Sequence, residues 1–133
     1  MIAPQKFTPR ASRWQDIVAC LKEHGIEVRS PGVEIGDVTK KFVIVTYYGA
    51  SSYLTYSSEK AVYDVTVYIP RANYSELEPY IQQVKDAMED LRPMLKLNGY
   101  ESPSFYDDTI KAHVVDIEYS AFRTFNGRSR YYG

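Results

Sequence analysis

The clearest pattern in the chain is a change of hydrophobic period within residues 61–91. From Ala61 to Ile69 apolar and polar residues alternate, which is typical of a strand buried on one face. One face carries Ala61, Tyr63, Val65, Val67 and Ile69, and the other carries Asp64, Thr66 and Tyr68. Pro70 is expected to end the strand, because proline has no N–H to donate to a neighbouring strand.

The same segment then takes up helical spacing. Its apolar positions recur every three or four residues and form one stripe: Leu77, Tyr80, Ile81, Val84, Met88 and Leu91. Ser75 and Glu78 have the spacing of a capping box, and Pro79 falls in the first turn, where its missing N–H costs least. Arg92 precedes Pro93, which predicts the end of the helix. A strand that leads into this helix indicates a helix packed on a sheet.

The first part of the chain predicts an arm and a second helix. Residues 1–11 contain two prolines and no periodicity, which favours an extended arm. Ser12, with Gln15 three residues later, is expected to cap a helix over residues 13–24 that ends at Gly25. Its apolar face carries Trp14, Ile17, Val18 and Leu21.

Strand-forming residues are concentrated in five segments: 26–29, 41–48, 61–69, 103–106 and 111–124. Between the second and third, residues 49–52 are expected to break the sheet, residues 53–56 to resume it, and residues 57–60 to turn. Residues 95–100 are assigned to a connector.

These elements give the order α-β-β-β-α-β-β. They predict an α+β fold in which two helices pack on one face of a mostly antiparallel sheet. With 133 residues, a single domain is expected, with a core over residues 12–123 and a basic C-terminal tail over residues 124–133.

Composition narrows the class of protein. The only cysteine, Cys20, excludes an internal disulfide framework and, on this argument, any cysteine-based zinc site. It lies beside the apolar face of the first helix, which favours a buried, inert thiol. No apolar run approaches the ~20 residues that span a membrane, and no signal peptide is visible, so we expect a soluble intracellular protein.

Charge is divided unevenly along the chain, although the net charge is only −1. The first 13 and the last 11 residues contain no acidic residue, and their basic residues are Lys6, Arg10, Arg13, Arg123, Arg128 and Arg130. Basic ends on an acidic body are suited to contact with neighbouring copies or with phosphate. Solvated tails are the alternative interpretation.

Residues that could carry catalysis are few. His24 ends a helix, and His113 lies mid-strand, where a structural role is favoured. Asp107 and Asp108 have the character of a turn. Because phosphate-binding glycine loops, a nucleophile elbow and local metal-ligand spacing are all absent, the sequence predicts no catalytic residue, cofactor or metal.

The 13 tyrosines are the most unusual feature of the composition. Tyrosine suits surfaces that are covered by a partner, because its ring is apolar and its hydroxyl stays polar. Cross-strand pairing within one sheet is an equal alternative, and base stacking is a third, although no RNP1 pattern is present. The predicted contact residues are Tyr47, Tyr48, Tyr53, Tyr56 and Tyr68, with Arg123, Arg128 and Arg130 of the tail.

Taken together, these features resemble a family of small structural proteins. The chain is similar to the tail terminators and head–tail joining (tail-completion, neck) proteins of long-tailed bacteriophages. The resemblance rests on the first amphipathic helix, the long paired strands, the segment YDVTVYIPRANYSELEPYIQQVKDAMEDL and the last strand, HVVDIEYSAFR. It covers roughly residues 12–123, and the basic tail has no counterpart in it.

The resemblance implies a virion protein that assembles in the host cytoplasm. Its subunits would form a homo-oligomeric ring, commonly a hexamer, which caps the tail tube protein and docks onto the head connector. DNA would pass through the lumen without specific binding. The family has no catalytic residues to carry over to this chain.

Two other functions remain open from the sequence. One is another neck or minor capsid protein of the same virion. The other, from a different class, is a small α+β domain that binds a ligand or nucleic acid. A pocket with converging polar groups favours the latter, and a broad tyrosine-rich surface favours assembly.

Overall fold

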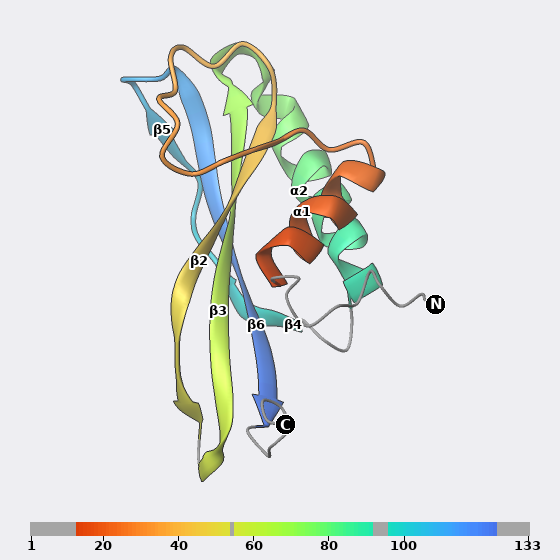
Figure 1. The fold of residues 1–133 in the computed structure, drawn as a ribbon. Helices are drawn as coiled ribbons and strands as arrows, with labels where there is room; N and C mark the ends of the chain where they lie inside the picture. Colours follow the sequence, from red (N-terminus) through yellow and green to blue (C-terminus); the bar gives the residue numbers. More distant parts are fainter. Residues whose placement is uncertain (1–12, 54, 92–95, 125–133) are drawn as a thin grey trace.

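The structure is a computed structural model that describes residues 13–53, 55–91 and 96–124. It has an α+β fold, in which one mixed six-stranded sheet carries two helices on one face (Figure 1). The predictions for residues 1–12, for the Arg92–Pro93 stop and for residues 125–133 lie outside the described residues.

The sheet has the strand order β1-β2-β3-β6-β4, and β5 pairs with the other end of β6. Only the β1–β2 pair is parallel. The bounds are β1 Val28–Arg29, β2 Phe42–Tyr53, β3 Thr55–Pro70, β4 Lys96–Glu101, β5 Phe105–Asp107 and β6 Ala112–Thr124. The predicted α+β class, the end of β3 at Pro70 and the long last strand are confirmed.

The two helices are α1 (Arg13–Glu23) and α2 (Leu77–Met88), flanked by the 3₁₀ turns η2 (Arg71–Glu76) and η3 (Glu89–Leu91). All six residues of the predicted α2–η3 stripe are buried. They pack with Ile17, Cys20 and Leu21 of α1 against the valine- and isoleucine-rich face of β2, β3 and β6. The prediction of two helices on one face is therefore confirmed.

The predicted interruptions at residues 49–52 and 57–60 are wrong. Both segments are strand, so β2 and β3 form one long hairpin whose ends meet at the Tyr53–Thr55 pair. The register shifts between Tyr47 and Gly49, and Gly49 has a φ of +125°. A glycine tolerates this backbone angle at a β-bulge, so the strand continues where the sequence favoured a break.

Two smaller predictions are also corrected. The segment assigned to a connector contains β4, which pairs with β6 from Lys96 to Glu101. The capping box is absent, because Ser75 lies inside η2 and α2 begins after Glu76 with no side-chain cap. The preceding 3₁₀ turn already leads the chain into the helix, so no side chain is needed there.

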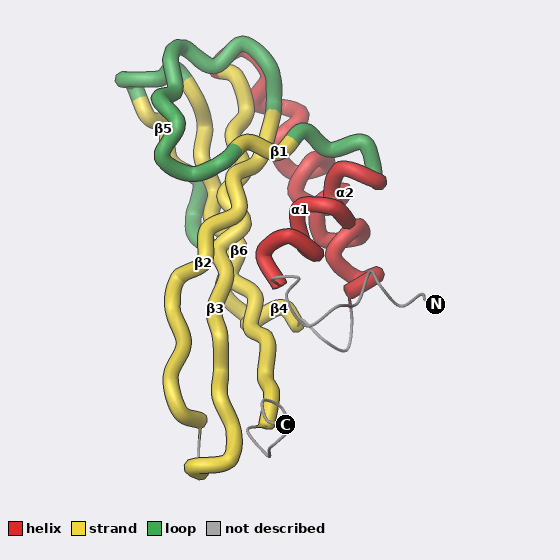
Figure 2. Tube along the Cα trace, in the orientation of Figure 1, coloured by secondary structure: helices red, strands yellow, loops and turns green. Residues whose placement is uncertain are grey.

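The sheet has a covered end and an open end. At the covered end (β2 residues 42–45, β3 residues 65–70 and β6 residues 112–117) both faces carry buried side chains, although Thr66, Tyr68 and Asp116 on the face opposite the helices are only half-buried. The helices cover one face, and the loop before β2 crosses the other (Figure 2). That loop encloses a second small core made of Val38, Phe42, Ile44, Ala112 and Val114, flanked by Ile35, Tyr68 and Ile110.

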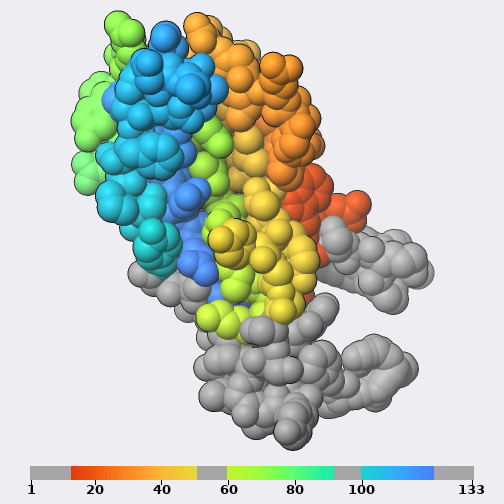
Figure 3. Space-filling model, turned by 90° about the vertical axis from the view of Figure 1, so that its left-hand side faces the viewer, coloured from red at the N-terminus to blue at the C-terminus, as the bar shows by residue number. Residues whose placement is uncertain are grey.

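The open end consists of β2 residues 46–53 and β3 residues 55–64, with the end of β6 beside them. On the helix side, Ala61 and Tyr63 still belong to the main core, and beyond them the strands run on past the helices as a projecting ribbon (Figure 1). Figure 3 views the face opposite the helices, with the loop before β2 (orange) and the β5 region (light blue) on either side of the strands at the covered end. The fold thus combines a compact body with an extended hairpin.

Candidate subunit-contact surface

The outer edge of β2 is covered by other parts of the chain as far as Val45. The short strand β1 covers the edge at Val43 and Ile44, and the Val43 N–H donates to the Glu27 carbonyl at 2.9 Å. One step further on, the Trp14 indole N–H donates to the Val45 carbonyl at 2.6 Å. The edge is therefore occupied up to Val45.

Beyond Val45 the edge has no strand partner within the described parts of the chain. Backbone groups of an antiparallel strand alternate sides, and those of Val43 and Val45 point outward, so those of Tyr47 also point outward. An edge with free N–H and C=O groups is a template for another strand. This edge, together with the Tyr47 and Tyr48 side chains, is named the β2 contact surface.

Two of the predicted contact residues lie on this surface. The Tyr47 side chain is 54% exposed and that of Tyr48 is 71% exposed. Tyr47 leans on Tyr63 across the hairpin at a ring-centroid distance of 5.4 Å, while Tyr48 occupies the extra position of the bulge. A bulge increases the local twist of the strand, and here it sits at the two exposed tyrosines.

Tyr68 has a different environment. Its ring stacks on Phe42 at 4.8 Å between centroids and flanks the second small core. Burial, and then the charges of Asp116 and Asp107, raise the pKa of Tyr68. Tyr68 is therefore half-buried against the second small core and lies apart from the β2 contact surface.

Three of the remaining predicted contact residues lie in the strands of the open end. Tyr53 and Tyr56 belong to β2 and β3 beside the hairpin turn. Arg123 lies in β6 opposite Glu59. Arg128 and Arg130 lie outside the described residues, so the structure does not place them.

An acidic strip runs along the sheet face opposite the helices. It consists of Asp64 on β3 and of Asp116 and Glu118 on β6, with Asp64 directly opposite Glu118. Thr66 donates to the Asp116 carboxylate at 2.6 Å. Burial, followed by the charges of Asp116 and Glu118, raises the pKa of Asp64. The strip repels anions, so this face is poorly suited to phosphate.

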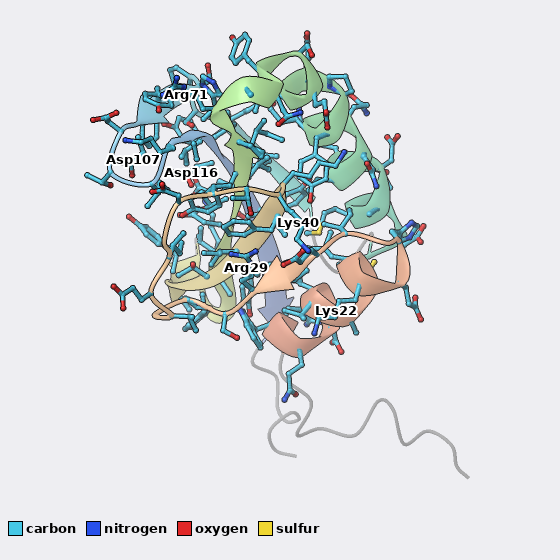
Figure 4. All side chains as sticks on the ribbon, turned by 90° about the horizontal axis from the view of Figure 1, so that it is seen from above. Lys22, Arg29, Lys40, Arg71, Asp107 and Asp116 are labelled. Atoms are coloured by element: carbon cyan, nitrogen blue, oxygen red, sulfur yellow. The ribbon has the colours of Figure 1, made fainter. Side chains whose placement is uncertain are left out.

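A polar depression of about 470 Å³ lies between the loop before β2 and the start of α2, near Lys40 in Figure 4. Its charged groups largely satisfy one another: Glu76 accepts from Lys41 at 3.2 Å and from Asn73 at 3.0 Å. On its wall, burial and the charge of Glu27 raise the pKa of Tyr80 to about 12. This depression favours the ligand-binding alternative.

The covered end contains His113 and Asp107, for which the sequence favoured a structural role over a catalytic one. The His113 ring nitrogen lies 3.3 Å from the Arg71 carbonyl, and its ring packs against those of Tyr74 and Tyr106. The Asp107 carboxylate accepts from the backbone and the hydroxyl of Thr109 at 3.0 and 2.6 Å. Figure 4, which is viewed from above the covered end, shows Arg71, Asp107 and Asp116 there. Asp107 thus serves turn geometry, as predicted.

Sequence reasoning missed one cluster, at the end of α1. His24 Nε2 lies 2.7 Å from an Asp90 carboxylate oxygen, and the ligand atoms of Cys20, His24 and Asp90 all lie within 4.8 Å of one another. Cys20 is buried, as predicted, and its thiol donates to the Ala87 carbonyl at 3.3 Å. The spacing of Cys20 and His24 places both on one helix face, but Asp90 comes 66 residues after His24.

No protein-family model matches the sequence, and a search of curated proteins finds no match. Among the helices of the described residues, none combines the length and apolar character that crossing a membrane requires.

Proposed function

We propose that this chain is a ring-forming subunit in the neck of a long-tailed bacteriophage. In this role it caps the finished tail tube and joins the tail to the head connector. The observation that carries the proposal is the β2 contact surface, an edge that is covered up to Val45 and that has no strand partner from Thr46 onward among the described residues. The proposal also draws on the resemblance of residues 12–123 to tail-completion proteins.

A ring requires two different patches on each subunit, because its contacts run head to tail. The β2 edge lies on one side of the sheet, and β4 is the outermost strand on the other. Strand addition at the β2 edge would supply main-chain hydrogen bonds, and Tyr47 and Tyr48 would supply apolar area beside them. Figure 1 shows the hairpin projecting beyond the helices, where a neighbouring subunit can reach it.

The acidic strip argues against the nucleic-acid alternative on the described sheet face. A DNA-binding surface gains affinity by neutralising phosphates with basic side chains, and Asp64, Asp116 and Glu118 do the opposite. A carboxylate-lined face would instead let DNA pass without being held, which agrees with passage through a lumen. The basic tail is the remaining place to test for phosphate contact, through binding that weakens steeply with salt.

The ligand-binding alternative rests on the depression near Lys40. Its Lys41–Glu76 and Asn73–Glu76 contacts lie within the subunit, so a charged ligand would have to break them. We therefore place the assembly function first and keep ligand binding as the second candidate.

Electron microscopy of tails assembled without this protein tests the function. The proposal expects tubes that are overlong or that carry no head, and restoration of normal particles when the wild-type chain is supplied. The purified chain alone should be monomeric or weakly associated and should form rings on its tube or connector. Normal tails in its absence would contradict the proposal.

A further inference from the structure

We propose that Cys20, His24 and Asp90 form a binding site for a zinc-like divalent cation at the junction of α1 and η3. The inference is independent of the proposed function, and it departs from the expectation that a single cysteine excludes a cysteine-based zinc site, because here one thiol is joined by an imidazole and a carboxylate. It rests on three different ligand types that converge from two elements, with their ligand atoms within 4.8 Å of one another. Thiolate, imidazole and carboxylate are the protein ligands that Zn²⁺ takes in tetrahedral sites.

The local fold explains why the three groups meet. Cys20 and His24 are four residues apart, so they lie one above the other on the same side of α1. That side faces the C-terminal end of α2, because the Cys20 thiol donates to the Ala87 carbonyl. Asp90, two residues beyond the end of α2, then reaches His24 at 2.7 Å.

The electrostatic surroundings favour a cation. α1 ends at Glu23 and α2 ends at Met88, so the negative ends of two helix dipoles lie near the cluster. The Asp90 carboxylate, 2.7 Å from His24, adds negative charge that attracts a divalent ion, and the charge of that ion would compensate a Cys20 thiolate.

The geometry needs only a small adjustment. Zinc–ligand bonds of about 2.0–2.3 Å place tetrahedral ligand atoms about 3.3–3.7 Å apart, so the longest separation in the cluster would shorten by roughly 1 Å and the 2.7 Å His24–Asp90 contact would lengthen by roughly 0.6 Å. The His24 and Asp90 side chains are partly exposed and are free to make that movement. On binding, the Cys20 thiol loses its proton to solvent and its sulfur binds the ion. Neutral His24 contributes a ring nitrogen, and water completes the coordination.

Metal titration of the full-length chain, after chelator treatment, tests the site. Co²⁺ should bind the metal-free chain in one-to-one ratio, with release of about one proton and a thiolate-to-cobalt charge-transfer band, and Zn²⁺ should then displace it without further proton release. Cys20→Ser should remove the band. His24→Gln and Asp90→Asn should each weaken Zn²⁺ binding at least ~10-fold, since loss of even an outer partner costs that much.

Asp86→Asn is the matched control. Asp86 is an exposed carboxylate of α2 whose contact is a 2.8 Å hydrogen bond from Gln82, and its replacement should leave Zn²⁺ affinity unchanged. Should Cys20→Ser fail to fold, His24→Gln and Asp90→Asn decide the question, because both change partly exposed side chains. A wild-type chain without the charge-transfer band, or variants with wild-type Zn²⁺ affinity, would overturn the site.

Discussion

The covered and open ends of the same sheet differ in how deeply their side chains are buried and in whether their backbone edge is paired. At the covered end, Val65, Val67 and Ile117 are fully buried under the helices, and Phe42 is fully buried on the opposite face. At the open end, the β2 edge has no strand partner among the described residues, and Tyr47 and Tyr48 are exposed. The comparison separates residues that hold the subunit together from residues available to a neighbour.

The largest stability effect is expected at the covered end. Ile117→Ala removes a side chain that is fully buried between the sheet and the helices, and should lower the free energy of unfolding by about 2–5 kcal/mol. Ile117→Val, the matched control, should cost about 0.5–1.5 kcal/mol. Urea unfolding measures both. A loss below 1 kcal/mol for alanine would show that this end is less tightly packed than described.

A smaller effect is expected where the two ends meet. Trp14→Phe keeps the aromatic ring but removes the indole N–H that donates to the Val45 carbonyl. The free energy of unfolding should fall by about 1 kcal/mol, the usual contribution of one hydrogen bond. Thermal and urea unfolding give the value. An unchanged stability would mean that water replaces the indole there without cost.

At the open end, stability and assembly should separate. Replacing Tyr47 and Tyr48 together by serine should lower the free energy of unfolding by no more than about 1 kcal/mol, because both side chains are largely exposed and only the Tyr47–Tyr63 ring contact is lost. Ring formation on the tail tube should be lost. Phe105→Ser is the control, since Phe105 is 52% exposed on β5 at the covered end. Equal ring formation by both variants would show that Tyr47 and Tyr48 do not belong to the interface.

The smallest effect is expected from the acidic strip. Asp64 has a raised pKa in the folded state, so the native state holds its proton to higher pH than the unfolded state does. Stability should therefore fall as pH rises from the unfolded value, near 4, through the raised folded value, and then level off. Asp64→Asn should flatten that slope and stabilise the protein slightly at neutral pH. Urea midpoints at a series of pH values measure this pH dependence. The same slope in Asp64→Asn as in the wild type would contradict the repulsion of Asp64 by Asp116 and Glu118.

The spacing of hydrophobic residues along the chain was enough to predict that α2 packs on the sheet. The alternation in residues 61–69 and the stripe from Leu77 to Leu91 each identify a buried face, and both faces are buried in the structure. The length of the hairpin was not predictable in this way. Serines and Gly49 are weak strand formers, and only the partner strand explains why they remain extended.

The candidate contact residues were predicted less completely. An exposed tyrosine and one stacked on a phenylalanine look alike in the sequence, so Tyr48 and Tyr68 could not be told apart. The Trp14 bond that marks the start of the open edge joins residues 31 positions apart. The Cys20, His24 and Asp90 cluster likewise depends on two helices that meet only in the fold.

The most direct measurement is electron cryo-microscopy of isolated tail tubes to which the purified chain has been added. The account predicts a closed ring at one end of the tube, with each subunit's β2 edge beyond Val45 covered by its neighbour. Tube ends without added density would contradict it. So would a ring in which that edge and Tyr48 face solvent.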